Sequence, residues 1–209
     1  MDPYWEGDGI KLYLADCSTI QDSWTGGDVL VTDPPYGISY KTHQLNATDH
    51  DLIHGDDAPF DPTHLLGFER AVIFGANNFT DMLPVANHWI VWDKVTRDGM
   101  DGLRLSECEM VWTRGVIGRS RVIRHMWSGA YRASERGTKY HPTQKPIAVM
   151  SRIILMVSSD GDTIVDPYAG SGSTLVAARL CGRAAIGVEI DERYCEVAAT
   201  RLDQGVLDF

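Results

Sequence analysis

The chain has 209 residues and a net charge of −10, a length that suits one compact domain with a substantial core. It has no run of eighteen apolar residues, and its acidic start lacks the apolar stretch of a secretion signal, so we expect a soluble, cytoplasmic protein and no membrane span. Four scattered cysteines without a Cys-x-x-Cys pair favour reduced core thiols over disulfides or zinc.

Short apolar, β-branched runs alternate with helical patterns along the chain, which is typical of an α/β fold with a buried parallel sheet. The expected strands are 11–15, 28–32, 71–74, 88–92, 107–113, 163–166 and 184–189. Helices are expected from Pro146 to about residue 158, from just after Gly172 to about residue 180, and after Asp191, which suits an N-cap. The last helix should bury Tyr194, Val197, Ala198 and Leu202.

The motif Asp33-Pro34-Pro35-Tyr36 follows the second expected strand, at the carboxyl edge where open α/β sheets bind ligands. Two prolines remove two backbone donors and stiffen the chain, so the Asp33 carboxylate and the proline carbonyls project as acceptors beside Tyr36. This set suits a planar ring with an NH2 group, because Asp33 and a carbonyl accept its hydrogens while Tyr36 stacks on the ring. The alternative is a rigid surface turn that binds nothing.

Two segments show no clear helix or strand pattern, and long irregular segments in a compact domain are usually functional loops. Segment 37–62 is polar and contains three histidines whose spacing matches no metal-ligand pattern. Segment 115–140 holds most of a basic cluster in which Glu135 is the one acid, so it is able to meet phosphate while the acidic remainder repels it. A solvated loop is the alternative, and Trp127 is a candidate for contact with a base or a sugar.

Residues 164–174 form the pattern of a strand, a small-residue turn and a helix start, which brings backbone close to nucleotide-like ligands. Leu175 stands where a dinucleotide fingerprint has its third glycine, so no pyrophosphate is indicated. Glu189 ends the next strand, where an acid accepts hydrogen bonds from both ribose hydroxyls. These residues suggest adenosine that carries a cationic or zwitterionic tail.

Together these motifs resemble the β group of DNA amino-methyltransferases, in which circular permutation places the acceptor motif before the cofactor motif. The resemblance runs from about Leu12 to Leu202. It includes His141-Pro142-Thr143-Gln144-Lys145-Pro146, similar to the block that meets the methionine part of the cofactor, and Leu14-Ala15-Asp16-Cys17, similar to the block near its adenine. The resemblance implies one Rossmann-like methyltransferase domain over 1–209, with a mostly parallel seven-stranded sheet, helices on both faces and the last strand antiparallel.

By motif position, the resemblance also implies the site residues. The catalytic group is Asp33, Pro34, Pro35 and Tyr36. The group that binds S-adenosylmethionine is Asp16, Cys17, His141, Thr143, Lys145, Asp166, Tyr168, Ala169, Gly170, Ser171, Gly172, Ser173, Thr174 and Glu189. The expected DNA-binding group comes from the basic cluster and not from a motif, and it is Arg119, Arg121, Arg124, Arg132 and Arg136. No metal is expected because methyl transfer from a sulfonium needs none.

The expected activity is methyl transfer from S-adenosylmethionine to N6 of an adenine flipped out of double-stranded DNA, by direct displacement, as in restriction–modification systems. Segment 37–62 is then a lid or a DNA-facing loop. Strictly specific members of the family carry a long target-recognition segment at the place of segment 115–140, which is short here. The recognised DNA sequence should therefore be short, or recognition should be relaxed. A homodimer is one assembly that the resemblance implies.

Two other functions stay open. A cytosine-N4 methyltransferase faces the same chemical problem, although Asp33 favours adenine because the cytosine group more often resembles Ser-Pro-Pro-Tyr. A non-catalytic cofactor- or DNA-binding module is the alternative of another class, and the intact acids Asp33, Asp166 and Glu189 count against it.

Overall fold

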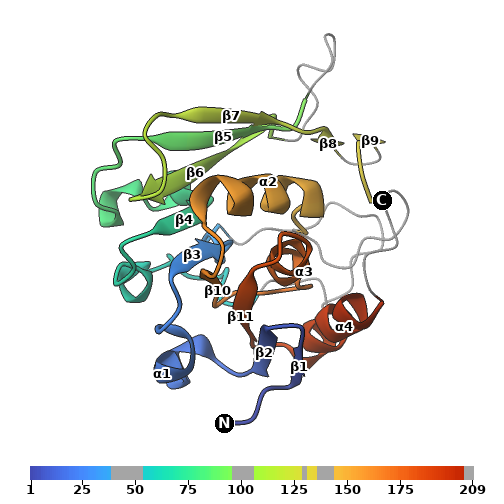
Figure 1. The fold of residues 1–209 in the computed structure, drawn as a ribbon. Helices are drawn as coiled ribbons and strands as arrows, with labels where there is room; N and C mark the ends of the chain where they lie inside the picture. The colour runs from blue at the N-terminus through green and yellow to red at the C-terminus, as the bar shows by residue number, and fades with distance from the viewer. Residues whose placement is uncertain (39–53, 96–105, 129–130, 136–143, 205–209) are drawn as a thin grey trace.

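The computed structural model describes residues 1–38, 54–95, 106–128, 131–135 and 144–204 (Figure 1). The strands are β1 (Trp5–Gly7), β2 (Ile10–Leu14), β3 (Val29–Thr32), β4 (Ala71–Phe74), β5 (Trp89–Asp93), β6 (Cys108–Arg114), β7 (Arg121–Arg124), β8 (Trp127–Ser128), β9 (Tyr131–Arg132), β10 (Thr163–Asp166) and β11 (Ala184–Glu189). The α-helices are α1 (Gln21–Trp24), α2 (Ile147–Val157), α3 (Ser173–Leu180) and α4 (Glu192–Asp203). Short 3-10 helices are η1 (Cys17–Thr19), η3 (Thr63–Leu65), η4 (Ala76–Asn78) and η5 (Thr80–Met82).

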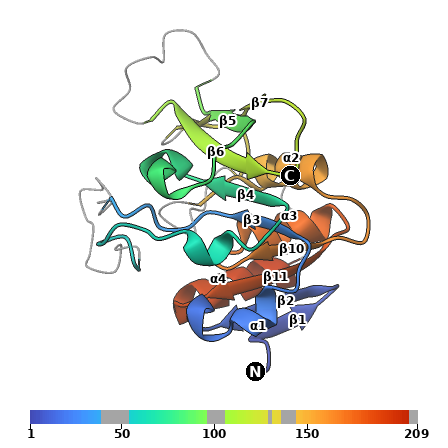
Figure 2. The same ribbon diagram turned by 90° about the vertical axis from the view of Figure 1, so that its left-hand side faces the viewer.

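Nine strands of the described residues form one mixed sheet in the order β1-β2-β11-β10-β3-β4-β6-β5-β7 (Figure 2). The neighbours from β2 to β4 in that order, and the pair β5 and β7, are parallel. Strand β1 runs antiparallel to β2, and β6 runs antiparallel to both of its neighbours. All seven expected strands are present, and the expectation of a largely parallel sheet is confirmed.

Two details of the expected sheet are wrong. The sheet has nine strands rather than seven, because β1 and β7 each extend one edge. Strand β1 is only three residues long and β7 buries one of its four residues, so neither has the apolar run of an interior strand. The last strand along the chain, β11, is parallel to both neighbours, and the strand that runs antiparallel to both of its neighbours is β6.

Both faces of the sheet are covered, as expected. On one face the helices α2, α3 and α4 contribute Ile154, Leu175 and Ala198 to the larger core cluster. On the other face α1 and the 3-10 helix η3 contribute Trp24 and Leu65 to a second cluster. Because successive strand residues point to opposite faces, a strand buried between two layers is apolar along its whole length.

The three main helices match their expected ranges. The Asp191 side chain caps α4 by accepting a hydrogen bond from the backbone N–H of Arg193 at 2.9 Å. Ala198 and Leu202 are buried as expected, whereas Tyr194 and Val197 are only partly buried.

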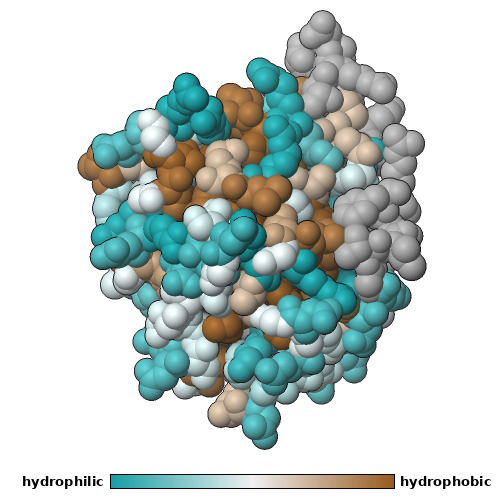
Figure 3. All heavy atoms as spheres, in the orientation of Figure 1, coloured by the Kyte–Doolittle hydropathy of each residue, from teal (hydrophilic) through white to brown (hydrophobic). Residues whose placement is uncertain are grey.

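The described surface mixes polar and apolar residues. Figure 3 shows apolar residues around the position of α2, and Leu155 on this helix is 60% exposed. No helix in the described ranges is long and apolar enough to cross a membrane. All four cysteines are free thiols, but Cys108 is exposed, which contradicts the expectation that all belong to the core.

Candidate active site

One cavity of about 1170 Å³ extends along the carboxyl ends of the central strands. It lies where β3 and β10 are adjacent in the sheet although they are far apart in the chain. The predicted site residues that line it are Asp16, Cys17, Asp33, Pro34, Pro35, Tyr36, Arg132, Lys145, Asp166, Tyr168, Ala169, Gly170, Ser171, Ser173, Thr174 and Glu189.

The other predicted site residues lie elsewhere. Gly172 is the N-cap of α3 and does not line the cavity. Arg119, Arg121 and Arg124 are exposed and away from it. Three further predicted residues, Arg136, His141 and Thr143, lie outside the described residues.

Asp166 joins the two central strands at the bottom of the cavity. Its carboxylate accepts hydrogen bonds from the hydroxyls of Thr32, at 2.7 Å, and Thr174, and from the backbone N–H of Tyr168 at 3.1 Å. Burial raises the pKa of Asp166 to about 6, and these hydrogen bonds oppose the rise. With so many protein donors, Asp166 shapes the loop around a ligand more than it offers a free acceptor.

Glu189 ends β11 on the same side of the cavity. Its two carboxylate oxygens accept hydrogen bonds from the backbone N–H groups of Gly170, at 2.7 Å, and Asp191, at 2.8 Å. Burial raises the pKa of Glu189. Each carboxylate oxygen has a second lone pair, so Glu189 is held in place and still has capacity to accept from a ligand's hydroxyls.

The small-residue turn between β10 and α3 depends on glycine. Gly170 and Gly172 have φ values of 52° and 79°, in the left-handed region. A Cβ at Gly172 would lie 2.8 Å from the Cβ of Ala198 on α4. The turn therefore keeps its backbone close to α4 only with glycine at this position.

Arg201 stabilises the turn between β10 and α3, and it was not predicted as a site residue. Its buried guanidinium donates to the carbonyl oxygen of Ser171 at 2.6 Å and contacts the carboxylate of Glu135 at 3.3 Å. Its position three residues after Ala198 placed it on the buried stripe of α4, which was the available signal.

The acceptor motif is held in a defined conformation. The Tyr36 hydroxyl donates to Asp33 Oδ1 at 2.7 Å, while Asp56 Oδ1 accepts from the backbone N–H groups of Tyr36, at 3.0 Å, and Gly37, at 2.8 Å. A Cβ at Gly75 would lie 1.9 Å from the Tyr36 ring, so the ring packs against bare backbone. Burial raises the pKa of Tyr36 well above its usual value, which keeps the phenol protonated.

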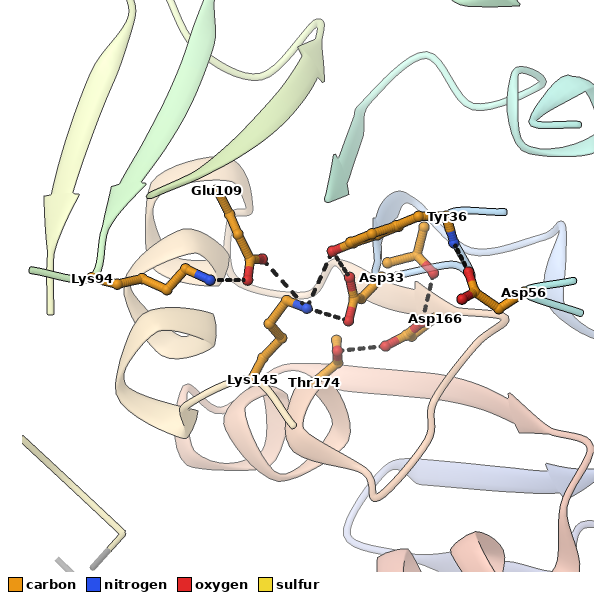
Figure 4. A network of polar contacts seen from close by, with 9 residues as sticks. Asp33, Tyr36, Asp56, Lys94, Glu109, Lys145, Asp166 and Thr174 are labelled. Atoms are coloured by element: carbon orange, nitrogen blue, oxygen red, sulfur yellow. Dashed lines mark hydrogen bonds and ion pairs between the residues drawn. The ribbon is translucent and has the colours of Figure 1, made fainter. Parts of the chain in front are cut away.

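A buried charge network surrounds the motif (Figure 4). Lys145 Nζ forms an ion pair with Asp33 Oδ2 and lies 3.4 Å from Glu109 Oε2, and Lys94 Nζ donates to Glu109 Oε1 at 2.8 Å. Burial raises the pKa of Asp33 against the opposing effect of Lys145. Burial acts the same way on Glu109, but there Lys145 and Lys94 outweigh it and lower the pKa. The positive charges of Lys94 and Lys145 equal the negative charges of Asp33 and Glu109, so the network has no net charge.

This network differs from the expected site in two respects. Lys145 was expected to meet the methionine part of a cofactor, but its ammonium contacts the acceptor motif. Glu109 was not predicted, because it is a single charged residue on a strand and matches no motif. Lys94 ends Trp92-Asp93-Lys94, a weak echo of the family at the end of an expected strand, but it was not predicted as a site residue.

The described part of the basic segment contains strands that were not expected. Arg121 and Arg124 lie on the edge strand β7, and the Arg132 guanidinium stacks on the Trp127 ring, 4.5 Å from its centroid. Trp127 and Arg132 both line the cavity. Basic side chains of this segment therefore extend from the edge of the sheet to the cavity wall.

Glu135, the one acid of the cluster, has a structural role. Its carboxylate accepts from the backbone N–H of Ile147 at 2.8 Å, in the first turn of α2, and from Gln144 Nε2 at 2.9 Å. An acid is favourable at a helix N-terminus because backbone donors there are unpaired. No group of three or more His, Cys, Asp or Glu suited to a metal ion occurs in the described part of the chain.

Comparisons with known proteins show what this chain is similar to. A family model described as DNA methylase matches residues 87–200. The chain is also similar to the type II methyltransferase M2.LlaDCHI of Lactococcus lactis subsp. cremoris, with 39% identity over 84 residues. That match covers 40% of this chain and 31% of the relative, so the chain spans about a third of that protein's length.

Solved structures show the same fold at low identity. The PvuII cytosine-N4-specific DNA methyltransferase has a TM-score of 0.65 and 15% identity, over 99% of this chain and 91% of that one. The M1.HpyAVI complex with S-adenosylmethionine has a TM-score of 0.56 and 20% identity, over 92% of this chain and 99% of that one.

Proposed function

The chain belongs to the N6/N4 DNA methylase family, and from that premise we propose that it transfers a methyl group from S-adenosylmethionine to the exocyclic N6 of an adenine in double-stranded DNA. The observation that carries the proposal is the shared cavity, in which Asp33 and Tyr36 face the same space as Gly170 and Glu189. Such a space allows a planar amine and an adenosine-bearing donor to be held side by side.

The cofactor half of the cavity suits S-adenosylmethionine. Glu189 has lone pairs for the ribose hydroxyls, and the turn at Ala169 and Gly170 offers backbone without bulky side chains. Asp16, which accepts from the backbone N–H of Ser18 at 2.8 Å, lines the wall where the resemblance puts the adenine. When bound, S-adenosylmethionine supplies a methyl group that its sulfonium has already activated. Similarity to a protein solved with this cofactor supports the assignment.

The acceptor half suits an exocyclic amine. The Asp33 carboxylate and a carbonyl of Pro34 or Pro35 accept the two amine hydrogens, while the Tyr36 ring stacks on the base. Holding both hydrogens turns the nitrogen lone pair out of conjugation with the ring, toward the methyl donor. Because a stacked base pair hides this nitrogen, the adenine must leave the duplex to enter the cavity.

We propose that DNA docks on the basic segment, 115–140. Arg119, Arg121 and Arg124 are exposed at or beside the sheet edge, and Arg132 connects this edge to the cavity. Phosphate contacts there would hold the duplex while the acidic remainder faces away. A segment this short offers few side chains for base edges, so the recognised sequence should be short or degenerate. A second subunit would add a second basic segment.

A cytosine-N4 activity is the second candidate. The cytosine-N4 enzyme PvuII shares the fold, and the N4 amine presents the same donor group to Asp33. The aspartate at the start of the motif favours adenine, because the cytosine group more often resembles Ser-Pro-Pro-Tyr.

Nucleoside analysis tests the proposal directly. The protein is incubated with mixed-sequence duplex DNA and methyl-labelled S-adenosylmethionine, and the DNA is digested to nucleosides and separated. We expect label in N6-methyladenine. Label in N4-methylcytosine would establish the second candidate, and unlabelled DNA with a folded protein would contradict both.

A further inference from the structure

An acid and a cation lie side by side on the wall of the acceptor half of the cavity. Lys145 Nζ is paired with Asp33 Oδ2, and both residues line the cavity. Their side chains are 7% and 17% exposed, so the pair is nearly removed from bulk water. The wall therefore presents a hydrogen-bond acceptor next to a hydrogen-bond donor.

The Lys145 ammonium is held at this place from several sides. Glu109 Oε2 lies 3.4 Å from Nζ, and the ring centroids of Tyr36 and Phe74 lie 5.7 Å and 5.4 Å away. Burial lowers the pKa of Lys145, but the carboxylates of Asp33 and Glu109 outweigh this effect and raise it, so the group stays a charged donor.

This ammonium makes one close contact and two long ones. It carries three N–H donors and no acceptor. Its contact with Asp33 is the closest, whereas the Tyr36 hydroxyl lies 3.3 Å away and Glu109 Oε2 lies 3.4 Å away. Among the described residues, that Glu109 oxygen has no hydrogen-bond partner. A ligand acceptor that enters the cavity is able to take the place of the long contact with the Tyr36 hydroxyl, which lies outside the usual hydrogen-bond distance.

The Watson–Crick edge of adenine has the complementary pattern. Its N6 amine is a donor, and the adjacent ring nitrogen N1 is an acceptor. We propose that Lys145 donates a hydrogen bond to N1 of the flipped adenine while Asp33 accepts from its N6 amine, so that the two side chains read the base edge together. This inference rests on the function proposed above and adds a residue that determines which base is accepted.

The pair would also reject guanine and thymine. Guanine and thymine present a carbonyl oxygen where adenine has its amine, and a ring N–H where adenine has N1. With either base, an oxygen would face the Asp33 carboxylate and a donor would face the Lys145 ammonium, leaving buried polar groups unpaired. Cytosine, with an amine beside an unprotonated ring nitrogen, presents the same pattern as adenine.

The contact would also favour the right nitrogen. N1 is itself a nucleophile, and a hydrogen bond from Lys145 occupies its lone pair. The N6 amine, whose hydrogens are held by Asp33 and a proline carbonyl, is then the nitrogen left to react. Lys145 therefore acts on both the choice of base and the choice of atom.

The test uses 1-deazaadenine, in which a C–H replaces N1 and the N6 amine is unchanged. A duplex whose methylated adenine has been located is made with either base at that position. For the unmodified protein we expect kcat/KM to fall about 10- to 100-fold on the analogue, since one charged hydrogen bond is lost. Equilibrium binding of the two duplexes, measured by fluorescence anisotropy without cofactor, should show a difference in the same direction.

Substitutions complete the comparison. Lys145→Met should lower kcat/KM on adenine by a similar factor and should no longer distinguish the two bases. The matched control is Lys11→Met, which removes an exposed lysine of β2 that does not line the cavity and should keep the discrimination of the unmodified protein. The measurement on unmodified protein needs no substitution, so poor folding of a variant does not remove the test.

Two results would overturn the inference. Equal rates and equal binding of the two duplexes by the unmodified protein would mean that Lys145 only balances the charge of Asp33. A Lys145→Met protein that keeps the discrimination but binds S-adenosylmethionine more weakly by calorimetry would place the ammonium at the cofactor. Failure of the proposed function looks different, because no methylated nucleoside would then form on ordinary DNA, whereas failure of this inference leaves methylation of ordinary DNA intact and removes only the difference between the two duplexes.

Discussion

The hydroxyl of Thr32, at the end of β3, donates a 2.7 Å hydrogen bond to the carboxylate of Asp166, at the end of β10. Thr32 directly precedes the acceptor motif, and Asp166 begins the glycine-containing turn. One buried hydrogen bond therefore connects the two halves of the cavity.

Thr32→Val should lower the free energy of unfolding by about 1–3 kcal/mol, because it keeps the shape of the side chain but leaves a buried carboxylate with one donor fewer. Urea denaturation measures the change. Thr32→Ser, which retains the hydroxyl, is the control and should lose clearly less stability. Equal losses in both variants would assign the effect to packing of the methyl group.

The raised pKa of Asp166 predicts a pH-dependent stability. Its pKa of about 6 in the folded protein lies above the usual value of about 3.9, so between these pH values the folded state binds more protons. Its contribution to stability is complete below about pH 3.9 and is lost as pH rises to about 6, by about 3 kcal/mol in all. Urea denaturation across this range should show a smaller loss for Asp166→Asn than for the unmodified protein. A loss of the same size in both would contradict the assignment to Asp166.

Asp33→Ala should reduce methyl transfer to below about one hundredth of the unmodified rate and leave S-adenosylmethionine affinity within about a few-fold. The lost contacts are those to the amine of the base. Initial rates and calorimetry measure the two effects, with Asp22→Ala, at an exposed position of α1, as the control. Loss of cofactor binding in folded Asp33→Ala would move Asp33 to the cofactor half or to a structural role.

Glu189→Ala should weaken S-adenosylmethionine binding by about 1–3 kcal/mol, because the ribose hydroxyls lose a charged acceptor. Calorimetry gives the value. The exposed Glu192→Ala should bind normally, and Glu189→Gln should fall between the two because it keeps one acceptor oxygen. A folded Glu189→Ala protein with unchanged affinity would rule out the ribose contact.

The basic segment predicts salt-dependent DNA binding. If its arginines make about three to five phosphate contacts, the log–log slope of affinity against salt should be roughly −3 to −4.5. The double variant Arg121→Ala with Arg124→Ala should bind more weakly and reduce the slope by about 2, measured by fluorescence anisotropy. Lys11→Ala with Arg193→Ala, both away from this edge of the sheet, is the matched control. A double variant that matches the unmodified protein would mean that DNA is held elsewhere, and the 37–62 segment would be the next to test.

Much of the fold was predictable because it rests on local signals. The interior strands have continuous apolar runs, and the turn from Asp166 to Thr174 is contiguous in sequence. The edge strand β7 was not predictable, because its exposed arginines suit one solvated side and hide its pairing with β5.

The charge network around the acceptor motif was not predictable for a different reason. Glu109 lies opposite Trp92 in the antiparallel pairing of β5 and β6, which brings it near Lys94. That register depends on how two separate segments align, and Glu109 belongs to no motif while Lys94 belongs only to a weak one. Lys145 was found by its motif, but its partner was expected to be the cofactor and is Asp33 in the structure.

The balance of the four charges of Lys94, Glu109, Lys145 and Asp33 has a kinetic consequence. Dissolved ions screen exposed charges over about 10 Å at 0.1 M salt, but they act much less on buried pairs. Added salt should therefore slow the association of DNA with the exposed arginines. The contacts of the buried charges with a base that is already in the cavity should stay unchanged. Arrival and retention of the substrate then depend on different groups, and a change in ionic strength separates them.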